Sequence, residues 1–283
     1  MSYRDLLLHV DTTEVGMKRA EFAIDFAQAQ KAHLTGVAFV ATRLDPYYCE
    51  PGILPTKPPE YFDTLRGKTE EVFSALKEKT TSAGVSFESR LCEGLPVDFL
   101  RQLSIYPRTV DLTILGQPGP ADIWGSYGEL ITRVLFTAKQ PVLIVPKKGQ
   151  TVTEPKTILA AWDGSAEAAY AFQIAKPLMM QAERVIVCMA DPEQNPLFKG
   201  RKPGEEMVRH LRCHDINVEL RHGHPSESKS NTVGDLMMTR VTEEKADLIV
   251  MGAYHHSRLR QSMVGGATQS IIENMPVPTL MAH

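Results

Sequence analysis

The chain of 283 residues contains an internal repeat, and this repeat limits the folds that it can adopt. An apolar run that ends in an aspartate with small polar residues behind it occurs twice, as DLLLHVDTT at 5–13 and as TILAAWDGS at 157–165. Each run leads into a stretch with apolar residues at three- and four-residue intervals, which predicts helices over 17–31 and 166–181. The two halves of the chain are therefore expected to be copies of one structural unit.

Further matches continue along both halves in the same order. Second strands are predicted at 33–40 and 184–190, and third strands in VSFESRLCEGLP and NVELRHGHP, which both end in Gly-x-Pro. Nearly continuous apolar runs follow, VDLTILG and ADLIVMG, and each half ends in another, PVLIVP and VPTLMAH. Continuous apolar strands are typical of parallel sheets that helices cover on both faces. The sequence predicts an α/β fold of two tandem doubly wound domains, each with a mostly parallel five-stranded sheet.

The domain boundary is predicted in the polar segment 147–156, which gives domains over 1–147 and 156–283. The spacing between matched positions falls from 152 residues at the strand-end aspartates to 129 at the Gly-x-Pro glycines, so the first half carries about 23 extra residues. Prolines and aromatic residues crowd about 42–65, and proline at this density predicts a loop. We expect this loop to pack on its own domain, with a lid or a partner surface as the alternative.

Composition excludes several classes of partner. The net charge of −3 produces no field that would attract nucleic acid or an anionic membrane, and no apolar run approaches the roughly 20 residues that span a bilayer. The chain starts without a cleavable leader pattern, and its four cysteines lie far apart without a Cys-x-x-Cys pair. We expect a cytoplasmic protein with free thiols. His210, Cys213 and His214 share a helix face, but we interpret that face as partly exposed and predict no metal site.

The two sets of matching elements resemble the universal stress protein family in its tandem form, over nearly the whole chain. The resemblance is carried by the strand-end Asp11 and Asp163, the Gly-x-Pro after the third strand, the (A/V)DL-apolar-Gly run and the proline-valine type of final strand. It implies a Rossmann-like, nucleotide-binding α-hydrolase-like fold and a regulatory role in the stress response. It also implies a bound ligand, ATP or a related adenine nucleotide, and leaves open whether Mg²⁺ accompanies it.

Nucleotide-binding members of the family share a loop, Gly-x2-Gly-x9-Gly-(Ser/Thr), between the fourth strand and the fourth helix. Glycines let the backbone approach a phosphate closely, and amides at a helix amino terminus point at the anion. The second half keeps Gly252 and Gly265 at the family spacing, with Gly266 at the hydroxyl position. His255 replaces the second glycine and would either add a cationic donor or close the pocket. Thr268 could supply a hydroxyl from the first turn of the helix.

The resemblance adds contacts at the ends of the first two strands. In the second half these positions are Asp163, Gly164, Ser165 and Met189. Met189 would touch the base, and Asp11 and Phe39 are the matching positions of the first half. Trp162 stands where the family commonly has a small or β-branched residue, so we expect it to narrow the base pocket.

The first half departs further from the family loop. It keeps Gly116 and Gly119, but Glu129 stands where the third glycine would be, and Asp122 adds a second carboxylate. Two negative side chains in an anion cradle repel phosphate. We therefore expect this half to bind nucleotide poorly or not at all.

Two functional classes remain for the whole chain. The first is a regulatory protein that binds nucleotide at its second domain, and the second is an interaction or adaptor protein of the stress response that needs no nucleotide. A slow ATP hydrolase is a third reading, but neither a Gly-x-Ser-x-Gly elbow nor a Walker motif occurs, so no catalytic residue is predicted.

The final strands of the two halves should cover one another, because exposed apolar edges promote association. An internal pseudo-dimer through 141–145 and 277–281 is predicted, while a homodimer of whole chains and the identity of protein partners stay open.

Overall fold

The computed structural model describes residues 3–41, 59–94, 99, 101–118, 127–191, 199–253 and 266–283. These residues form two copies of a β/α unit. The elements of the first repeat are β1 (Asp5–Val10), α1 (Glu14–Gln30), β2 (His33–Ala41), α2 (Pro59–Ser82), β3 (Phe87–Gly94), β4 (Leu112–Gly116), α4 (Tyr127–Arg133) and β5 (Val142–Val145). The elements of the second are β6 (Thr157–Ala161), α5 (Ala166–Gln181), β7 (Arg184–Ala190), α6 (Pro203–Arg212), β8 (Val218–Gly223), α7 (Val233–Glu243), β9 (Leu248–Gly252), α8 (Gly266–Asn274) and β10 (Thr279–Ala282).

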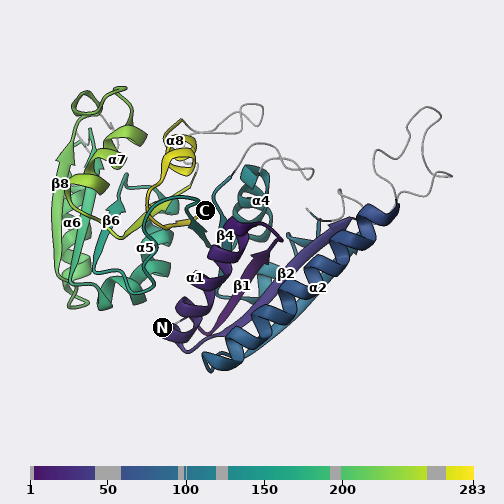
Figure 1. Cartoon of the computed structure of the whole chain (residues 1–283). Helices are drawn as coiled ribbons and strands as arrows, with labels where there is room; N and C mark the ends of the chain where they lie inside the picture. The colour runs from purple at the N-terminus through teal and green to yellow at the C-terminus, as the bar shows by residue number, and fades with distance from the viewer. Residues whose placement is uncertain are drawn as a thin grey trace, which may run out of the picture.

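The strands of both repeats join into one sheet of ten, in the order β3-β2-β1-β4-β5-β10-β9-β6-β7-β8 (Figure 1). Neighbours within each repeat are parallel, and β5 and β10 pair antiparallel. The predicted architecture of two doubly wound units that pair through their last strands is confirmed. In each unit the strand order reverses at the first strand, β1 or β6, which is where ligands bind in folds of this kind.

The junction between the repeats is apolar and buried. Leu280 lies opposite Leu143, and Met281 lies opposite Val142, and each of these side chains is at most 1% exposed. Because each of these strands covers the other, neither is left as an open apolar edge.

Side-chain contacts also cross from the first repeat into the second. The buried Gln117 follows β4, and its amide nitrogen donates to the carbonyls of Ile272 and Glu273 at 3.0 and 2.9 Å. Those carbonyls belong to the last turn of α8, where a helix leaves acceptors without partners of its own. The hydroxyl of Tyr3 donates to the carbonyl of Ile174 in α5 at 2.8 Å.

Helices cover both faces of the sheet and divide its core into two layers. Helices α1, α2, α5 and α6 pack on one face, and α4, α7 and α8 pack on the other. Alternate residues of each strand serve the two layers, so Leu6 and Leu8 belong to the first layer and Leu159 and Ile186 to the second. Nowhere in the described ranges is a helix both long and apolar enough to cross a bilayer.

Helix starts follow from capping side chains. Helix α5 begins at Ala166, as predicted, because the hydroxyl of Ser165 accepts a hydrogen bond from the backbone N–H of Ala168. Helix α1 begins at Glu14, three residues earlier than the apolar periodicity indicates, because Thr13 caps Gly16 in the same way.

The prediction of a loop over about 42–65 is wrong for its last part. Helix α2 already starts at Pro59 and includes Tyr61 and Phe62, whose rings meet edge to face at 5.5 Å. Proline is compatible with the first turn of a helix, where its missing N–H has no partner to lose, so Pro59 starts α2 rather than preventing it. Residues 42–58 lie outside the described part of the chain.

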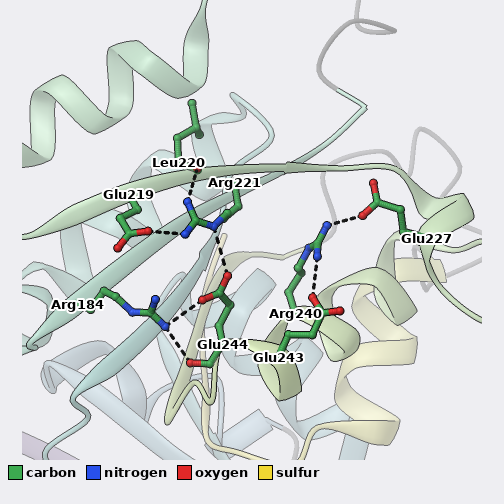
Figure 2. A network of polar contacts seen from close by, with 8 residues as sticks. All are labelled: Arg184, Glu219, Leu220, Arg221, Glu227, Arg240, Glu243 and Glu244. Carbon is green, nitrogen blue, oxygen red and sulfur yellow. Dashed lines mark hydrogen bonds and ion pairs between the residues drawn. The ribbon is translucent and has the colours of Figure 1, made fainter.

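The outer edge of the second repeat carries charged side chains (Figure 2). Arg221 on β8 bridges Glu219 and Glu244, and Glu244 also accepts from Arg184 at 2.9 Å. Charges on an edge strand discourage pairing with another chain. The outer edge of the sheet is thus charged, whereas the junction between the repeats is apolar.

We predict that the junction contributes strongly to stability. Leu280→Ala should lower the free energy of unfolding by about 2–5 kcal/mol, because it opens a cavity in a fully buried position. Met180→Ala, at a side chain that is 58% exposed, is the control and should change it by less than about 0.5 kcal/mol. Urea titration monitors both variants. Equal stability of the two would contradict this role for the junction.

Candidate functional site

A cavity of about 280 Å³ lies at the carboxyl ends of β6, β7 and β9, in the second repeat. It brings together four of the residues that the sequence predicts for the site, namely Asp163, Met189, Gly252 and Thr268. Asp163 follows β6, Met189 and Gly252 lie at the ends of β7 and β9, and Thr268 lies on α8, so the parallel order of the sheet brings them to one edge. The sulfur of Met189 is directed toward Gly204 of α6, because a Cβ on that glycine would lie 2.7 Å from it. The cavity occupies the reversal of strand order at β6, as expected for a doubly wound sheet.

The turn after β6 holds Asp163 at this edge. The carboxylate of Asp163 accepts a hydrogen bond from the backbone N–H of Ser165 at 3.0 Å. Gly164 lies between them at φ 75°, a conformation that glycine adopts without strain. Ser165 is buried and uses its hydroxyl to cap α5. Gly164 and Ser165 therefore shape the turn, and Asp163 is the residue of the three that lines the cavity.

Gly252 ends β9 where α5 passes close to the strand. A Cβ atom on Gly252 would lie 2.4 Å from the backbone nitrogen of Ala168, so packing alone requires glycine there. Gly266 is exposed and begins α8, which carries Thr268 in a buried position on the cavity wall. His255 and Gly265, the other predicted residues of the phosphate loop, lie outside the described residues.

Most of the cavity wall is apolar. The larger apolar side chains that the sequence does not predict come from β7, β9, α7 and α8. They are Cys188, Val233, Met237, Met251 and Ile271. Burial raises the pKa of the Cys188 thiol to about 11, so this cysteine is a neutral wall residue at pH 7. Polar groups are contributed by Asp163, Thr268 and a further carboxylate, Asp191. Such a cavity suits a flat apolar ring that carries hydrogen-bond donors at its edges.

Asp191 comes directly after β7 and could have been found from the sequence, since strand-end aspartates mark the same edge at Asp163. The residues from α7 and α8 carry no comparable signal, because their side of the cavity depends on how these helices pack.

The indole of Trp162 differs from its expected place. Its Nε1 donates to the carbonyl of Pro203 at 3.1 Å, and its ring packs 5.4 Å from Phe172 on α5. Both contacts lie in the layer of α5 and α6, on the other face of the sheet from Met237 and Ile271. Trp162 borders the cavity, but its ring is held by the opposite layer rather than inserted between the apolar walls.

The corresponding space in the first repeat is filled by side chains. Strand register matches His9 with Val37, and Ala161 with Cys188, so Phe39 is the counterpart of Ala190 rather than of Met189. His9 and Phe39 thus replace two alanines that line the cavity of the second repeat. Their rings lie 6.0 Å apart, and Phe39 also packs 5.0 Å from Phe99. Burial and the nearby Arg19 lower the pKa of His9 to about 4, which keeps it neutral at pH 7.

Arg19 closes the first repeat further. Its guanidinium is 2% exposed and pairs with the Asp11 carboxylate at 2.6 Å. Its Nε donates to the carbonyl of His9, and a Cβ on Gly116 would lie 2.3 Å from its Nη1. The same repeat position in the second half is Ala171, eight residues after Asp163 as Arg19 is after Asp11. The aspartate that the resemblance assigns to ligand binding is thus already paired in the first repeat.

The ion pair sets the protonation of Asp11. Burial alone would raise the pKa of this carboxyl, but the Arg19 guanidinium and a hydrogen bond from Thr13 lower it well below its usual range. These contacts would also weaken nucleotide binding by the first repeat. Their cause differs from the expected repulsion of phosphate by Asp122 and Glu129. Asp122 lies outside the described residues, as does the side chain of Glu129.

Comparisons with known proteins agree with this architecture. Residues 154–283 match the model of the Universal stress protein family. The universal stress protein Slr1230 of Synechocystis sp. is 28% identical over 219 residues, which cover 75% of this chain and 71% of that protein.

Two solved structures share the fold over nearly the whole chain. The universal stress protein from Archaeoglobus fulgidus DSM 4304 has a TM-score of 0.73 at 20% identity, with 98% of this chain and 95% of that chain covered. A functionally unknown protein from Pseudomonas aeruginosa PAO1 has a TM-score of 0.60 at 14% identity, with 99% and 92% covered.

We predict that the Asp11–Arg19 pair stabilises the first repeat and shapes its acid response. Arg19→Met should lower the free energy of unfolding by about 3 kcal/mol at pH 7, because it leaves a largely buried carboxylate without its counterion. Since the folded pKa of Asp11 is depressed, the wild-type contribution is present above about pH 4 and is lost as the pH falls below it. The loss of stability between pH 5 and pH 2 should therefore be shallower in the variant.

Urea titrations at several pH values measure this difference. Arg201→Met removes an exposed ion pair with Glu206 and serves as the control, with a much smaller expected effect. Parallel pH profiles for wild type and Arg19→Met would refute the assignment.

Proposed function

We propose that this chain, whose residues 154–283 match the Universal stress protein family, is a regulatory protein of the stress response that binds ATP or a related adenine nucleotide in the cavity of its second repeat. The observation that carries this proposal is the convergence of Asp163, Met189, Gly252 and Thr268 on one cavity. The family resemblance assigns these same positions to the site. An accompanying Mg²⁺ and any hydrolysis stay open.

The chemistry of the cavity favours one orientation of the ligand. Two carboxylates, Asp163 and Asp191, line its walls and would repel phosphate groups. The amino terminus of α8 offers backbone amides and the positive end of a helix dipole, and it lies beside the end of β9 at Gly252. The phosphates therefore belong at β9 and α8. The base and the sugar belong between the apolar walls.

The size of the cavity agrees with this arrangement. Its volume of about 280 Å³ is near the lower end of ligand pockets, which hold about 300–1,000 Å³. That space suits a base with its sugar, while a polyphosphate would extend beyond it over the start of α8. Val233, 39% exposed, lies at the cavity on the first turn of α7 and adds an apolar contact there.

The proposal assigns one nucleotide to each chain. His9, Phe39 and Arg19 occupy the first repeat where the second has alanines, so the first repeat serves as the structural partner. We place the protein in the cytoplasm, whose reducing conditions suit the free thiols of Cys92, Cys188 and Cys213.

Isothermal titration with ATP tests the site. The wild type should bind about one nucleotide per chain, and Ala190→Phe should abolish binding, because it copies into the second repeat the side chain that fills the first. Phe39→Leu is the matched control and should leave the affinity unchanged. No binding by the wild type would refute the nucleotide function, and undiminished binding by Ala190→Phe would place the ligand elsewhere.

A further inference from the structure

The end of the cavity at β7 carries a carboxylate that the family resemblance does not assign. Asp191 directly follows β7 and lines the cavity, with its side chain 23% exposed. Its backbone N–H donates to the carbonyl of Gly223 at 3.1 Å, which ties this turn to β8. The backbone of Asp191 has φ 42°, in the left-handed region that residues other than glycine seldom adopt. Backbone strain of this kind is concentrated at functional sites.

A neighbouring histidine fixes the orientation of this carboxylate. Nδ1 of His224, the residue between Gly223 and Pro225, donates a hydrogen bond to Oδ1 of Asp191. The backbone N–H of His224 in turn donates to Glu227 at 2.8 Å. Glu227 forms an ion pair with Arg240 on α7 (Figure 2). The Asp191 carboxylate is therefore held by a chain of polar contacts that reaches the helix on the cavity wall.

The sheet order places this carboxylate next to the adenine base of the proposed nucleotide. Strands β9 and β7 flank β6 on opposite sides, so a ligand with its phosphates at Gly252 extends across β6 toward Met189 and Asp191. A carboxylate is only an acceptor when ionised, so the ligand must present a donor to it. In an adenine base that donor is the exocyclic amino group. Oδ1 already accepts from His224, and Oδ2 makes no hydrogen bond to another described residue.

We propose that Asp191 recognises the exocyclic amino group of the base and that His224 is its positioning residue. This inference rests on the proposed nucleotide function and adds a determinant of base specificity to it. Apolar walls accept the ring of any purine, whereas a partly buried acceptor discriminates against a base that lacks the matching donor.

Isothermal titration of the full chain with two probes tests the inference. The probes are ATP and purine riboside triphosphate, which differs from ATP only in lacking the amino group. The wild type should bind ATP about 10- to 100-fold more tightly than the analogue, as expected for one hydrogen bond to a charged group. Asp191→Gly should lower the affinity for ATP to that for the analogue and leave the affinity for the analogue unchanged.

Two further variants separate recognition from structure. Glycine tolerates a positive φ, so Asp191→Gly removes the carboxylate while relieving strain, and the fold should be retained. Asp215→Gly relieves the same strain at φ 59° in the turn before β8, at the amino ends of the strands and thus away from the cavity. It should change neither the affinity for ATP nor that for the analogue. His224→Ala should weaken ATP binding less than Asp191→Gly does, again without an effect on the analogue.

The outcomes distinguish the two levels of the proposal. A wild type that binds neither probe would overturn both the nucleotide function and the role of Asp191. Equal wild-type affinity for the two probes, or an equal loss for both in Asp191→Gly, would overturn the role of Asp191 while nucleotide binding stands.

Discussion

The antiparallel pairing of β5 with β10 is the contact on which the rest of this structure depends. It joins two sheets of five strands into one of ten, and it buries apolar strands that would otherwise be open edges. Charged side chains lie instead at the outer edge, where Arg221 on β8 pairs with Glu219 and with Glu244 at the end of α7. Because the junction fixes both repeats on one frame, their equivalent positions can be compared residue by residue.

That comparison shows how one fold carries a cavity in one repeat and large side chains at the equivalent positions of the other. The backbone topology of the repeats is the same, but small side chains in the second repeat correspond to large ones in the first. Ala161 and Ala190 line the cavity beside Asp163, whereas His9 and Phe39 stand at the equivalent positions beside Asp11, and Arg19 stands where the second repeat has Ala171. Arg19 also pairs with the Asp11 carboxylate from within the chain. The difference between the repeats is therefore one of side-chain volume and charge.

The sequence predicts the repeat, the sheet and the junction because these features depend on local patterns of period two and period 3.6. It predicts four residues of the cavity because strand ends and glycines mark one edge of a parallel sheet. It misses Met237 and Ile271 because their contribution depends on how α7 and α8 pack. It misplaces the indole of Trp162 and overlooks Arg19, since the layer in which a long side chain packs is decided by tertiary contacts. The density of prolines over about 42–65 predicts a loop, although Pro59 lies in the first turn of α2, where proline is compatible with a helix.

The hydrogen bonds from Gln117 to the last turn of α8 connect the first repeat with the helix that lines the cavity of the second. One end of α8 lies at the cavity through Thr268, and the carbonyls of its other end are satisfied by an amide from the neighbouring repeat. A ligand that displaces α8 must therefore either break these bonds or carry Gln117 with it. Thermodynamic linkage is reciprocal, so a partner that shifts Gln117 together with α8 would change the affinity of the proposed nucleotide site by the same factor by which the nucleotide changes the affinity for that partner. The first repeat would then act on the proposed site of the second through α8.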